Sequence, residues 1–215
     1  MNKFCILLTC CMSPMYCTEK EIEKRKKLYL KVIKKWLKET EFAIYCVDSS
    51  GYKFSEIENK RFHLYSFLYK NKDPHVGKSN GECKSILKAY KYFKKDFTKY
   101  NFIIKITGRY FLNNLEKWTK KMENRKMRKD LYTQRKCMHL PHSLAYYFLS
   151  YVNSEIFVCR TSKLYEMFSN KDKNTIMEEH LFNLEEQHVQ KYTKLPYFKN
   201  TLKTKRGDNL ILQYL

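Results

Sequence analysis

The sequence predicts an α/β protein in which helices flank an open, mostly parallel sheet. Short apolar runs typical of buried strands alternate with amphipathic helical patterns through the first half of the chain. In such an alternation each helix connects two parallel strands by a right-handed crossover. The chain has 215 residues, 43% of them hydrophobic, and is long enough for one domain of this kind with its own core.

The first half is expected to contain four strands and two helices. We favour a buried first strand at 4–11 over a signal peptide, because this apolar run is short and a highly charged segment follows it. Thr18, with Glu21 three residues later, is a capping box that predicts a helix to about Lys38. The remaining elements are expected as strands at 42–47, 63–69 and 101–111 and a helix at 82–100.

The second half shows a mixed pattern. Helices are expected at 113–121, 161–169 and 175–192, and strands at 131–137 and 156–160. Residues 122–129 form a basic connector, and 195–215 a tail with few packing signals. The sequence contains no internal repeat and no low-complexity tract. Because a length of 215 residues suits one α/β domain, we expect residues 1–215 to form a single domain.

The composition is strongly basic. Lys and Arg number 43 against 22 Asp and Glu, a net charge of +21, which is typical of proteins with an anionic partner. The lysines are spread over the chain, and the abundance of Lys, Asn and Ile also fits an A/T-rich coding genome. A basic nucleic-acid-binding module is an alternative, but aromatics such as those of the helix at 82–100 fall at core spacing. We therefore expect no specific nucleic-acid partner.

The eight cysteines contain no C-x-x-C pair, which argues against a zinc ribbon or a thioredoxin-type site. We interpret them as reduced thiols of a cytoplasmic protein. No segment approaches the roughly 20 apolar residues of a membrane span. His139 and His142, with Cys137 nearby in sequence, lack an evident fourth ligand, so we expect no metal site there.

The strongest functional signal is the end of the strand at 101–111. Its apolar run is followed by Lys105, Gly108 and Arg109. Ligands of open α/β sheets bind at the carboxyl ends of the strands, cations there favour an anionic ligand, and a glycine allows close approach. The segment therefore predicts a site for a phosphate-bearing small molecule. The alternative is that Arg109 forms a structural salt bridge.

Two weaker signals precede this strand. Asp48 follows the strand at 42–47 directly, where a carboxylate can accept hydrogen bonds from a ribose or base, or can cap a turn instead. Residues 77–82, GKSNGE, place two glycines, Lys78 and Glu82 ahead of a predicted helix. This is an anion-binding arrangement without Walker A spacing, and the alternative is an ordinary helix-entry loop.

Glu178, Glu179 and His180 open a late predicted helix. A carboxylate in this place could act as a general base toward a substrate hydroxyl, and His180 could orient it or bind a metal. Acidic residues are also common in the first turn of a helix because they complement its dipole, and from this segment alone we favour that interpretation.

Taken in order along the chain, these segments resemble a family of small glycosyltransferases with the GT-A fold, found among surface-polysaccharide enzymes of bacteria and large viruses. The resemblance covers about residues 4–190, and KITGRY following a GK-x-x-GE loop is its most specific part. The matching stretches are ILLTCCMSP (6–14), the spacing of Arg25 and Tyr29, WLKET (36–40), YCVDSSG (45–51), GKSNGE (77–82), KITGRYF (105–111) and EEHLF (178–182).

The resemblance implies transfer of a sugar from a nucleotide-diphosphate donor to a glycan hydroxyl. Residues 1–111 would bind the nucleotide sugar, and 112–194 would serve the acceptor and catalysis. The implied donor contacts are Thr9 and Asp48 on the nucleoside, Lys78 and Glu82 near the ribose or diphosphate, and Arg109, with Lys105 behind it, on the diphosphate or sugar. Glu178 or Glu179 matches the acidic base of inverting members. The base and sugar of the donor, UDP- or GDP-linked, stay open.

One departure from the family concerns metal. Many GT-A enzymes hold Mn²⁺ or Mg²⁺ with Asp-x-Asp after the fourth strand, whereas this chain has Thr107-Gly108-Arg109 there and no Asp-x-Asp anywhere. We therefore expect no protein-held metal, with leaving-group charge neutralised at least partly by Arg109 and lysines. A metal bound mainly by the diphosphate stays open, as does an inactive relative that only binds nucleotide sugars. The basic surface could also hold the protein near membrane-linked acceptors.

Overall fold

The computed structural model describes residues 3–14, 17–70, 77–124, 127, 129–137, 150–187 and 192–194. Its strands are β1 (Phe4–Cys10), β2 (Ile44–Asp48), β3 (Phe62–Ser66), β4 (Phe102–Thr107), β5 (Leu131–Cys137), β6 (Ser150–Arg160) and β7 (Tyr192–Lys194). Its helices are α1 (Glu19–Glu39), α2 (Gly77–Tyr92), α3 (Lys94–Phe97), α4 (Leu115–Asn124), the 3₁₀ turn η2 (Thr161–Lys163), α5 (Leu164–Ser169) and α6 (Met177–Gln187).

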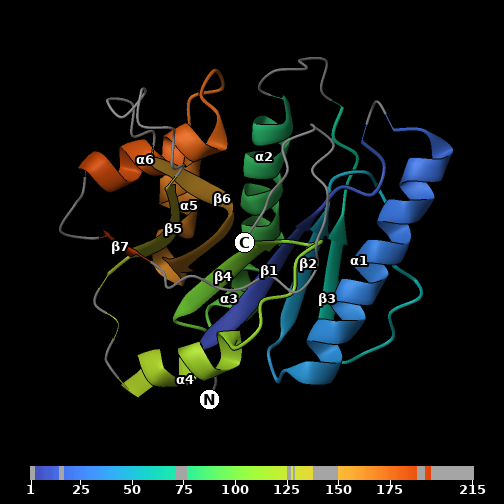
Figure 1. Ribbon diagram of the computed structural model, residues 1–215, viewed down its shortest axis with the longest axis horizontal. Helices are drawn as coiled ribbons and strands as arrows, with labels where there is room; N and C mark the ends of the chain where they lie inside the picture. The colour runs from blue at the N-terminus through green and yellow to red at the C-terminus, as the bar shows by residue number, and fades with distance from the viewer. Residues whose placement is uncertain are drawn as a thin grey trace.

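The described strands form one seven-stranded sheet in the order β3-β2-β1-β4-β6-β5-β7. Strands β1 to β4 are mutually parallel, and β6 runs antiparallel to both β4 and β5. The carboxyl ends of β1 and β4 lie side by side, with Thr9 opposite Thr107. The chain therefore has the expected GT-A-like fold, an open and mostly parallel sheet flanked by helices (Figure 1).

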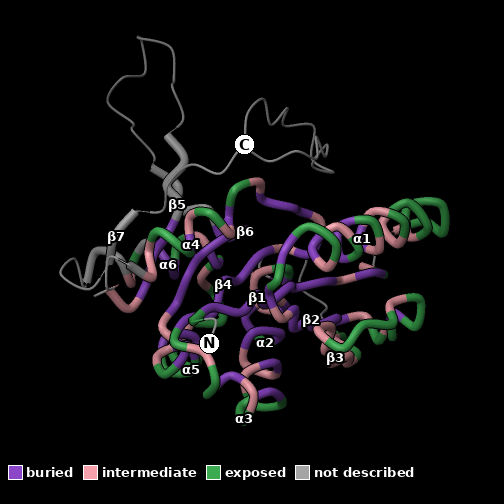
Figure 2. Tube along the Cα trace, turned by 90° about the horizontal axis from the view of Figure 1, so that it is seen from below, coloured by how far each residue is buried: buried purple, intermediate pink, exposed green. Residues whose placement is uncertain are grey.

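Two hydrophobic cores cover the two faces of the sheet. Alternate residues of β1 enter each core, as the two-residue period of a strand requires: Ile6 and Leu8 pack under α1, while Cys5 and Leu7 pack under α2, α5 and α6. All seven residues of β1 are buried and all but Thr9 are hydrophobic, as expected of a central strand that is covered on both faces. Figure 2 shows the buried strands between helices whose outer sides are exposed.

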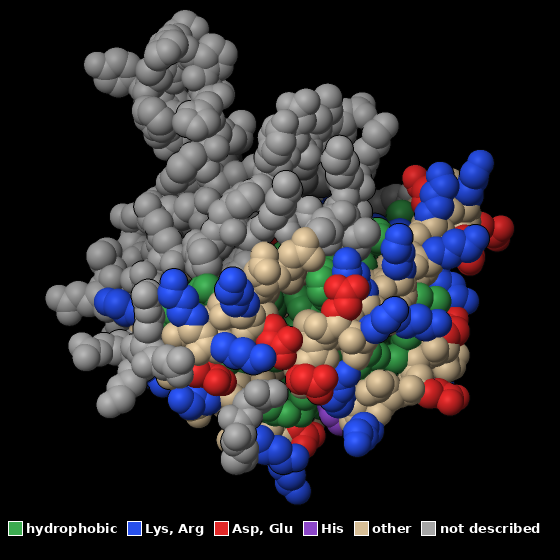
Figure 3. Space-filling view, turned by 60° about the horizontal axis from the view of Figure 1, so that its bottom comes forward, with side chains coloured by type: hydrophobic (Ala, Val, Ile, Leu, Met, Phe, Trp, Pro, Cys, Tyr) green, Lys and Arg blue, Asp and Glu red, His purple; other side chains and the backbone are tan. Residues whose placement is uncertain are grey.

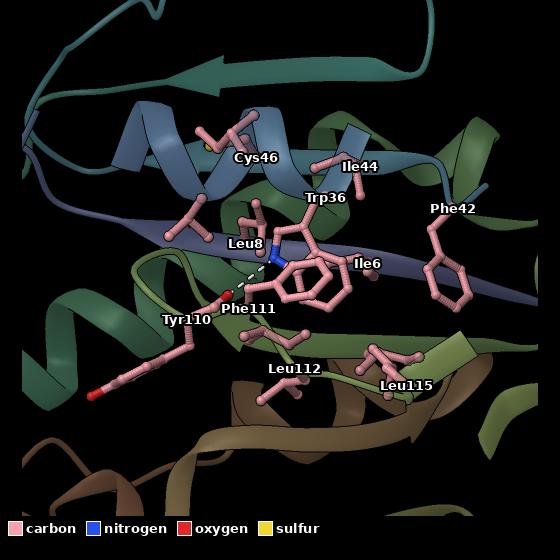
Figure 4. Close-up of a cluster of buried hydrophobic side chains, with 14 of the residues drawn as sticks. Ile6, Leu8, Trp36, Phe42, Ile44, Cys46, Tyr110, Phe111, Leu112 and Leu115 are labelled. Carbon is pink, nitrogen blue, oxygen red and sulfur yellow. Dashed lines mark hydrogen bonds between the residues drawn. The ribbon is translucent and has the colours of Figure 1, made fainter. Parts of the chain in front are cut away.

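Helix α1 begins at the predicted capping box. The Thr18 hydroxyl accepts from the backbone N–H of Glu21, and the Glu21 carboxylate accepts from the backbone N–H of Thr18 at 2.8 Å. The helix buries four residues on its inner side: Tyr29, Val32, Ile33 and Trp36. The Trp36 indole N–H donates to the Tyr110 carbonyl oxygen at 3.0 Å, which ties α1 to the segment after β4 (Figure 4).

Most predicted elements are confirmed, with shifted ends. The expected strand at 156–160 is the last part of β6, and the helix expected at 175–192 ends with α6 at Gln187, whereas Tyr192 belongs to β7. One prediction is wrong. The segment 77–82 is not a loop ahead of a helix, because α2 already begins at Gly77. The predicted tail at 195–215 and the loop with His139 and His142 lie outside the described residues.

Candidate functional site

A buried lysine organises the carboxyl edge of the central strands. The Lys105 side chain is fully buried, and its ammonium forms an ion pair with Glu82 of α2. The same ammonium donates to the backbone carbonyl oxygen of Ser154 at 2.6 Å. The Thr9 hydroxyl, at the end of β1, donates to the Glu82 carboxylate at 3.3 Å. Three predicted site residues from distant parts of the chain thus meet at one place.

Glu178 joins this cluster through Ser154. The Ser154 hydroxyl donates to a Glu178 carboxylate oxygen at 2.6 Å, and Glu178 lies in the first turn of α6 with part of its side chain open to solvent. The pairing of β5 with β6 jumps here, from Thr133 opposite Phe157 to Gln134 opposite Asn153. Residues 154–156 therefore form a bulge in β6. Bulges next to functional sites redirect side chains, and this one brings Ser154 to Glu178.

Arg109 is paired with a carboxylate. Its Nη2 donates to Glu155 at 3.1 Å, and the Tyr110 hydroxyl donates to the same carboxylate oxygen at 2.7 Å. The structural salt bridge that we considered for Arg109 is therefore present. The pairing does not use the whole guanidinium: its Nε is buried and has no hydrogen-bond partner among the described residues. Such an unsatisfied donor is uncommon and can take a further acceptor.

Gly108 is required by close packing between β1 and β4. A Cβ at this position would lie 2.2 Å from the Cys10 sulfur and 3.2 Å from the Tyr29 ring. The backbone N–H of Gly108 donates to the Thr9 carbonyl oxygen at 2.9 Å. The glycine thus allows β4 to approach β1 closely, and it fixes the backbone between Lys105 and Arg109.

Asp48 caps a turn, as in the second of its two interpretations. One carboxylate oxygen accepts from the backbone N–H groups of Ser50 and Tyr52, and the other accepts from the backbone N–H of Met12 at 3.1 Å. The side chain is fully buried, and this burial raises the pKa of Asp48 while the hydrogen bonds oppose the shift. Its acceptor sites therefore serve the ends of β1 and β2.

The glycines of segment 77–82 have a packing role inside α2. A Cβ on Gly81 would lie 2.9 Å from the ring of Tyr69. The Asn80 side chain donates to the Lys173 carbonyl oxygen at 2.7 Å and accepts from the Lys171 ammonium, which ties the start of α2 to the loop before α6. Lys78 is exposed in the first turn of α2.

The structure distinguishes between the residues of the acidic segment. Glu178 faces Ser154, whereas Glu179 is exposed. His180 is buried, and its Nε2 lies 2.8 Å from the Met167 carbonyl oxygen. Burial lowers the pKa of His180, which favours the neutral ring. His180 thus packs α6 against α5 instead of orienting a carboxylate.

Sequence reasoning missed Ser154, Glu155 and Tyr110, which complete the cluster. The charged side chains of the cluster are two cations, Lys105 paired with Glu82 and Arg109 paired with Glu155, and the Glu178 carboxylate, which Ser154 holds. The cations that the strand motif placed here are therefore matched by acids from other elements. Within the described part of the chain, no group of three or more His, Cys, Asp or Glu is arranged to hold a metal ion.

Seven cysteines of the described segments form no disulfide with one another, and the side chain of Cys137 lies outside the description. A surface hollow lined by Glu39, Thr40 and residues 111–117 lies near the amino edge of the sheet, away from the Lys105 cluster. In the described residues, no helix is both long and apolar enough to cross a bilayer.

Comparison with protein-family models finds no match for this chain, and comparison with curated proteins finds none. Solved structures do share its fold. A cytidylyltransferase from Leptospira borgpetersenii is 15% identical with a TM-score of 0.52, over 100% of this chain and 82% of that one. A protein from Desulfovibrio desulfuricans described as a nucleotide-diphospho-sugar transferase is 10% identical with a TM-score of 0.53, over 91% and 80% of the two chains.

A third structure, described as a glucose-1-phosphate thymidylyltransferase from Bacillus anthracis in complex with a sucrose, is 11% identical with a TM-score of 0.51. It covers 92% of this chain and 89% of its own. At sequence identities this low, similarity to a solved structure shows a shared fold and does not show a shared reaction. The chain has the three-dimensional architecture of nucleotidyl- and nucleotide-diphospho-sugar transferases, and the chemistry has to be argued from its own residues.

Proposed function

We propose that this chain is a glycosyltransferase that moves a sugar from a nucleotide-diphosphate donor to a hydroxyl of a glycan, as the resemblance to surface-polysaccharide enzymes implies. The observation that supports it best is a partly exposed carboxylate, Glu178, held by Ser154 beside the Lys105–Glu82 pair. The pair lies at the carboxyl edge of the sheet, where open α/β sheets bind their ligands. Structures with the same fold are named for nucleotidyl and nucleotide-diphospho-sugar transfer.

Glu178 is the proposed general base. Its carboxylate would take the proton of the acceptor hydroxyl as that oxygen bonds to the anomeric carbon, while the bond from this carbon to the diphosphate oxygen breaks and the nucleoside diphosphate leaves. Attack from the side opposite the leaving group inverts the anomeric centre. The hydrogen bond from Ser154 fixes the orientation of the carboxylate before the acceptor arrives. Glu179 is exposed and has no catalytic role in this proposal.

Arg109 and Lys78 are the proposed contacts of the donor diphosphate. The Arg109 side chain is 24% exposed, although its Nη2 is paired with Glu155. Lys78 is exposed in the first turn of α2, where backbone N–H groups also favour an anion. The Lys105 ammonium is already paired with Glu82 and hydrogen-bonded to the Ser154 carbonyl oxygen. We therefore propose that Lys105 positions these two residues and does not bind phosphate.

A second candidate reaction is nucleotidyl transfer, because two structures with this fold are named cytidylyltransferase and thymidylyltransferase. In that reaction a sugar phosphate attacks the α-phosphate of a nucleoside triphosphate, and pyrophosphate leaves. The two reactions therefore differ in the small product that is released. Glycosyl transfer releases a nucleoside diphosphate, whereas nucleotidyl transfer releases pyrophosphate.

The test measures both products. The protein is incubated with UDP- and GDP-sugars plus glycan acceptors, and separately with nucleoside triphosphates plus sugar phosphates. We expect acceptor-dependent release of nucleoside diphosphate, with Glu178→Gln lowering kcat by roughly 10²–10⁴-fold. Glu179→Gln, the matched control one residue away, should change kcat by no more than about twofold. Equal losses in the two variants would remove Glu178 from the base role.

Other outcomes identify the rivals. Release of pyrophosphate alone would replace glycosyl transfer by nucleotidyl transfer. A rise in melting temperature with UDP or GDP but no turnover with any donor would indicate an inactive relative that binds nucleotide sugars. A rise with a short DNA and not with nucleotides would favour a nucleic-acid-binding module. Loss of turnover in EDTA would contradict neutralisation of the leaving group by Arg109 and lysines alone.

A further inference from the structure

The outer side of α1 presents a continuous row of lysines. Successive members are four or three residues apart, which places all of them on one side of a helix. The row, called here the lysine stripe, consists of Lys20, Lys24, Lys27, Lys31, Lys34 and Lys38. All six are exposed, and from first to last the row spans about 27 Å at the helical rise of 1.5 Å per residue. Figure 2 shows this exposed outer side of α1.

The charge of the stripe is largely uncompensated. Lys27 lies 4.0 Å from Glu23, and the other five members form no salt bridge with any residue that the structure describes. Lys26 and Lys35, the helix's remaining lysines, are the ones paired with Glu56 and Glu39. Residues 19–39 contain nine Lys and Arg against four Glu, a net charge of +5. Figure 3 shows Lys and Arg side chains spread over the described part of this face, including the right-hand side where Figure 1 places α1, with Asp and Glu side chains among them.

The chemistry of the stripe is that of ammonium groups alone. The helix has one arginine, Arg25, and it turns inward to donate to the Cys11 carbonyl oxygen at 2.9 Å and to the Tyr29 hydroxyl. No Asn, Gln, Ser or Thr occurs within 19–39. The large hydrophobic side chains that are exposed in the described residues lie outside this helix, at Leu68, Tyr92, Tyr165 and Ile176.

We propose that the lysine stripe of α1 binds an anionic lipid membrane surface. A row of point charges without hydrogen-bonding geometry suits a flat layer of lipid headgroups, to which each nearby lysine contributes. Single-stranded nucleic acid fits less well, because its bases stack on exposed aromatic side chains, which this side of α1 lacks. Duplex DNA also fits less well, because its recognition uses the bidentate hydrogen bonds of arginine and other polar side chains, which are absent here too. Without exposed apolar residues on α1, the binding is electrostatic and reversible.

The proposal stands apart from the proposed function, since it uses none of the residues at the carboxyl edge. The test is sedimentation of the full chain with vesicles of phosphatidylcholine containing about one third phosphatidylserine, and with vesicles of phosphatidylcholine alone, at low salt. We expect binding to the anionic vesicles only. The binding should fall steeply as the ionic strength rises above about 0.1 M, where the Debye length drops below roughly 10 Å.

Two variants locate the surface. The stripe variant combines Lys24→Gln, Lys31→Gln, Lys34→Gln and Lys38→Gln. The matched control combines Lys84→Gln, Lys91→Gln, Lys94→Gln and Lys95→Gln, four exposed lysines of α2 and α3 on the opposite face of the sheet. Both lower the net charge by the same amount. We expect the stripe variant to lose affinity roughly a hundredfold or more and the control only a fewfold.

Three results would overturn the proposal. They are equal losses in the two variants, no binding of the unaltered chain to anionic vesicles at low salt, and stripe-dependent binding to a duplex oligonucleotide that is tighter than binding to vesicles. All eight substituted side chains are exposed, so we expect both variants to fold. Thermal unfolding of the two variants checks this.

Discussion

At the scale of single residues, the most unusual feature is Lys105, a lysine with no exposed surface. Burial of an ammonium is unfavourable unless the charge is paired and hydrogen-bonded. Here Glu82 supplies the charge, the Ser154 carbonyl oxygen accepts a second bond, and the Phe157 ring lies 5.8 Å from the nitrogen. One side chain therefore connects β4, α2 and β6 at the place where the proposed base is also held.

Substitution of Lys105 or of Glu82 alone should destabilise the protein. Substitution of both should lower the free energy of unfolding by less than the sum of the two single losses. Lys105→Met leaves the Glu82 carboxylate, 21% exposed, without its cation, and we expect a loss of about 3 kcal/mol in the free energy of unfolding. Glu82→Gln leaves a buried ammonium without its anion and should cost at least as much.

The measurement is urea unfolding of the two single variants and the double variant at neutral pH. The double variant should recover at least about 1 kcal/mol relative to the sum of the single losses, because each partner's unpaired charge is then absent. Strictly additive losses would show that Lys105 and Glu82 do not act as a pair. In that case the cluster would not be a unit that positions Ser154 and Glu178.

At the scale of elements, hydrophobic period and capping predicted most of the sheet and α1. The start of α2 was missed because Gly77 and Gly81 resemble loop residues, and only the fold reveals that Gly81 packs against Tyr69. Tertiary packing here overrides the low helix propensity of glycine.

The site was predicted in part for a related reason. The strand motif correctly places Lys105 and Arg109 at the end of β4. Their carboxylate partners stand 23 and 46 residues away in the sequence, at Glu82 and Glu155, so no local pattern could show that both cations are paired. The bulge that directs Ser154 toward Glu178 depends on the register between β5 and β6, which is a property of the sheet and not of a segment.

The contact between α1 and the segment after β4 gives an element-scale prediction. Trp36 is fully buried, its ring centroid lies 4.4 Å from that of the tilted Phe111 ring, and its indole N–H donates to the Tyr110 carbonyl oxygen (Figure 4). Trp36→Phe keeps most of the apolar contact but removes this donor in a buried setting. We expect a loss of about 1–3 kcal/mol in the free energy of unfolding.

Urea unfolding followed by circular dichroism measures this loss. Trp118→Phe in α4 is the control, because Trp118 is only partly buried and a smaller loss is expected. If the two substitutions destabilise the protein equally, the indole hydrogen bond to the Tyr110 carbonyl does not anchor α1 to the chain after β4.

At the scale of the whole molecule, the surface charge is poorly balanced. Among the described residues nine ion pairs form, and in only two of them, Lys105–Glu82 and Arg109–Glu155, is one side chain nearly or fully buried. Exposed pairs contribute little to stability. A net charge of +21 therefore acts mainly as repulsion between like charges in the folded state.

Screening this repulsion should stabilise the fold. Between ionic strengths of about 0.01 and 0.15 M the Debye length falls from about 30 to 8 Å, so long-range repulsion weakens while the two buried pairs are little affected. A gain of about 1 kcal/mol would raise the Tm by about 2–4 °C for a chain of this size. Thermal unfolding in increasing sodium chloride measures the effect.

The stripe variant, with four fewer lysines on α1, should show a smaller rise in Tm, since part of the repulsion has already been removed. A Tm that falls with salt would mean instead that attractive pairs of surface charges outweigh the repulsion.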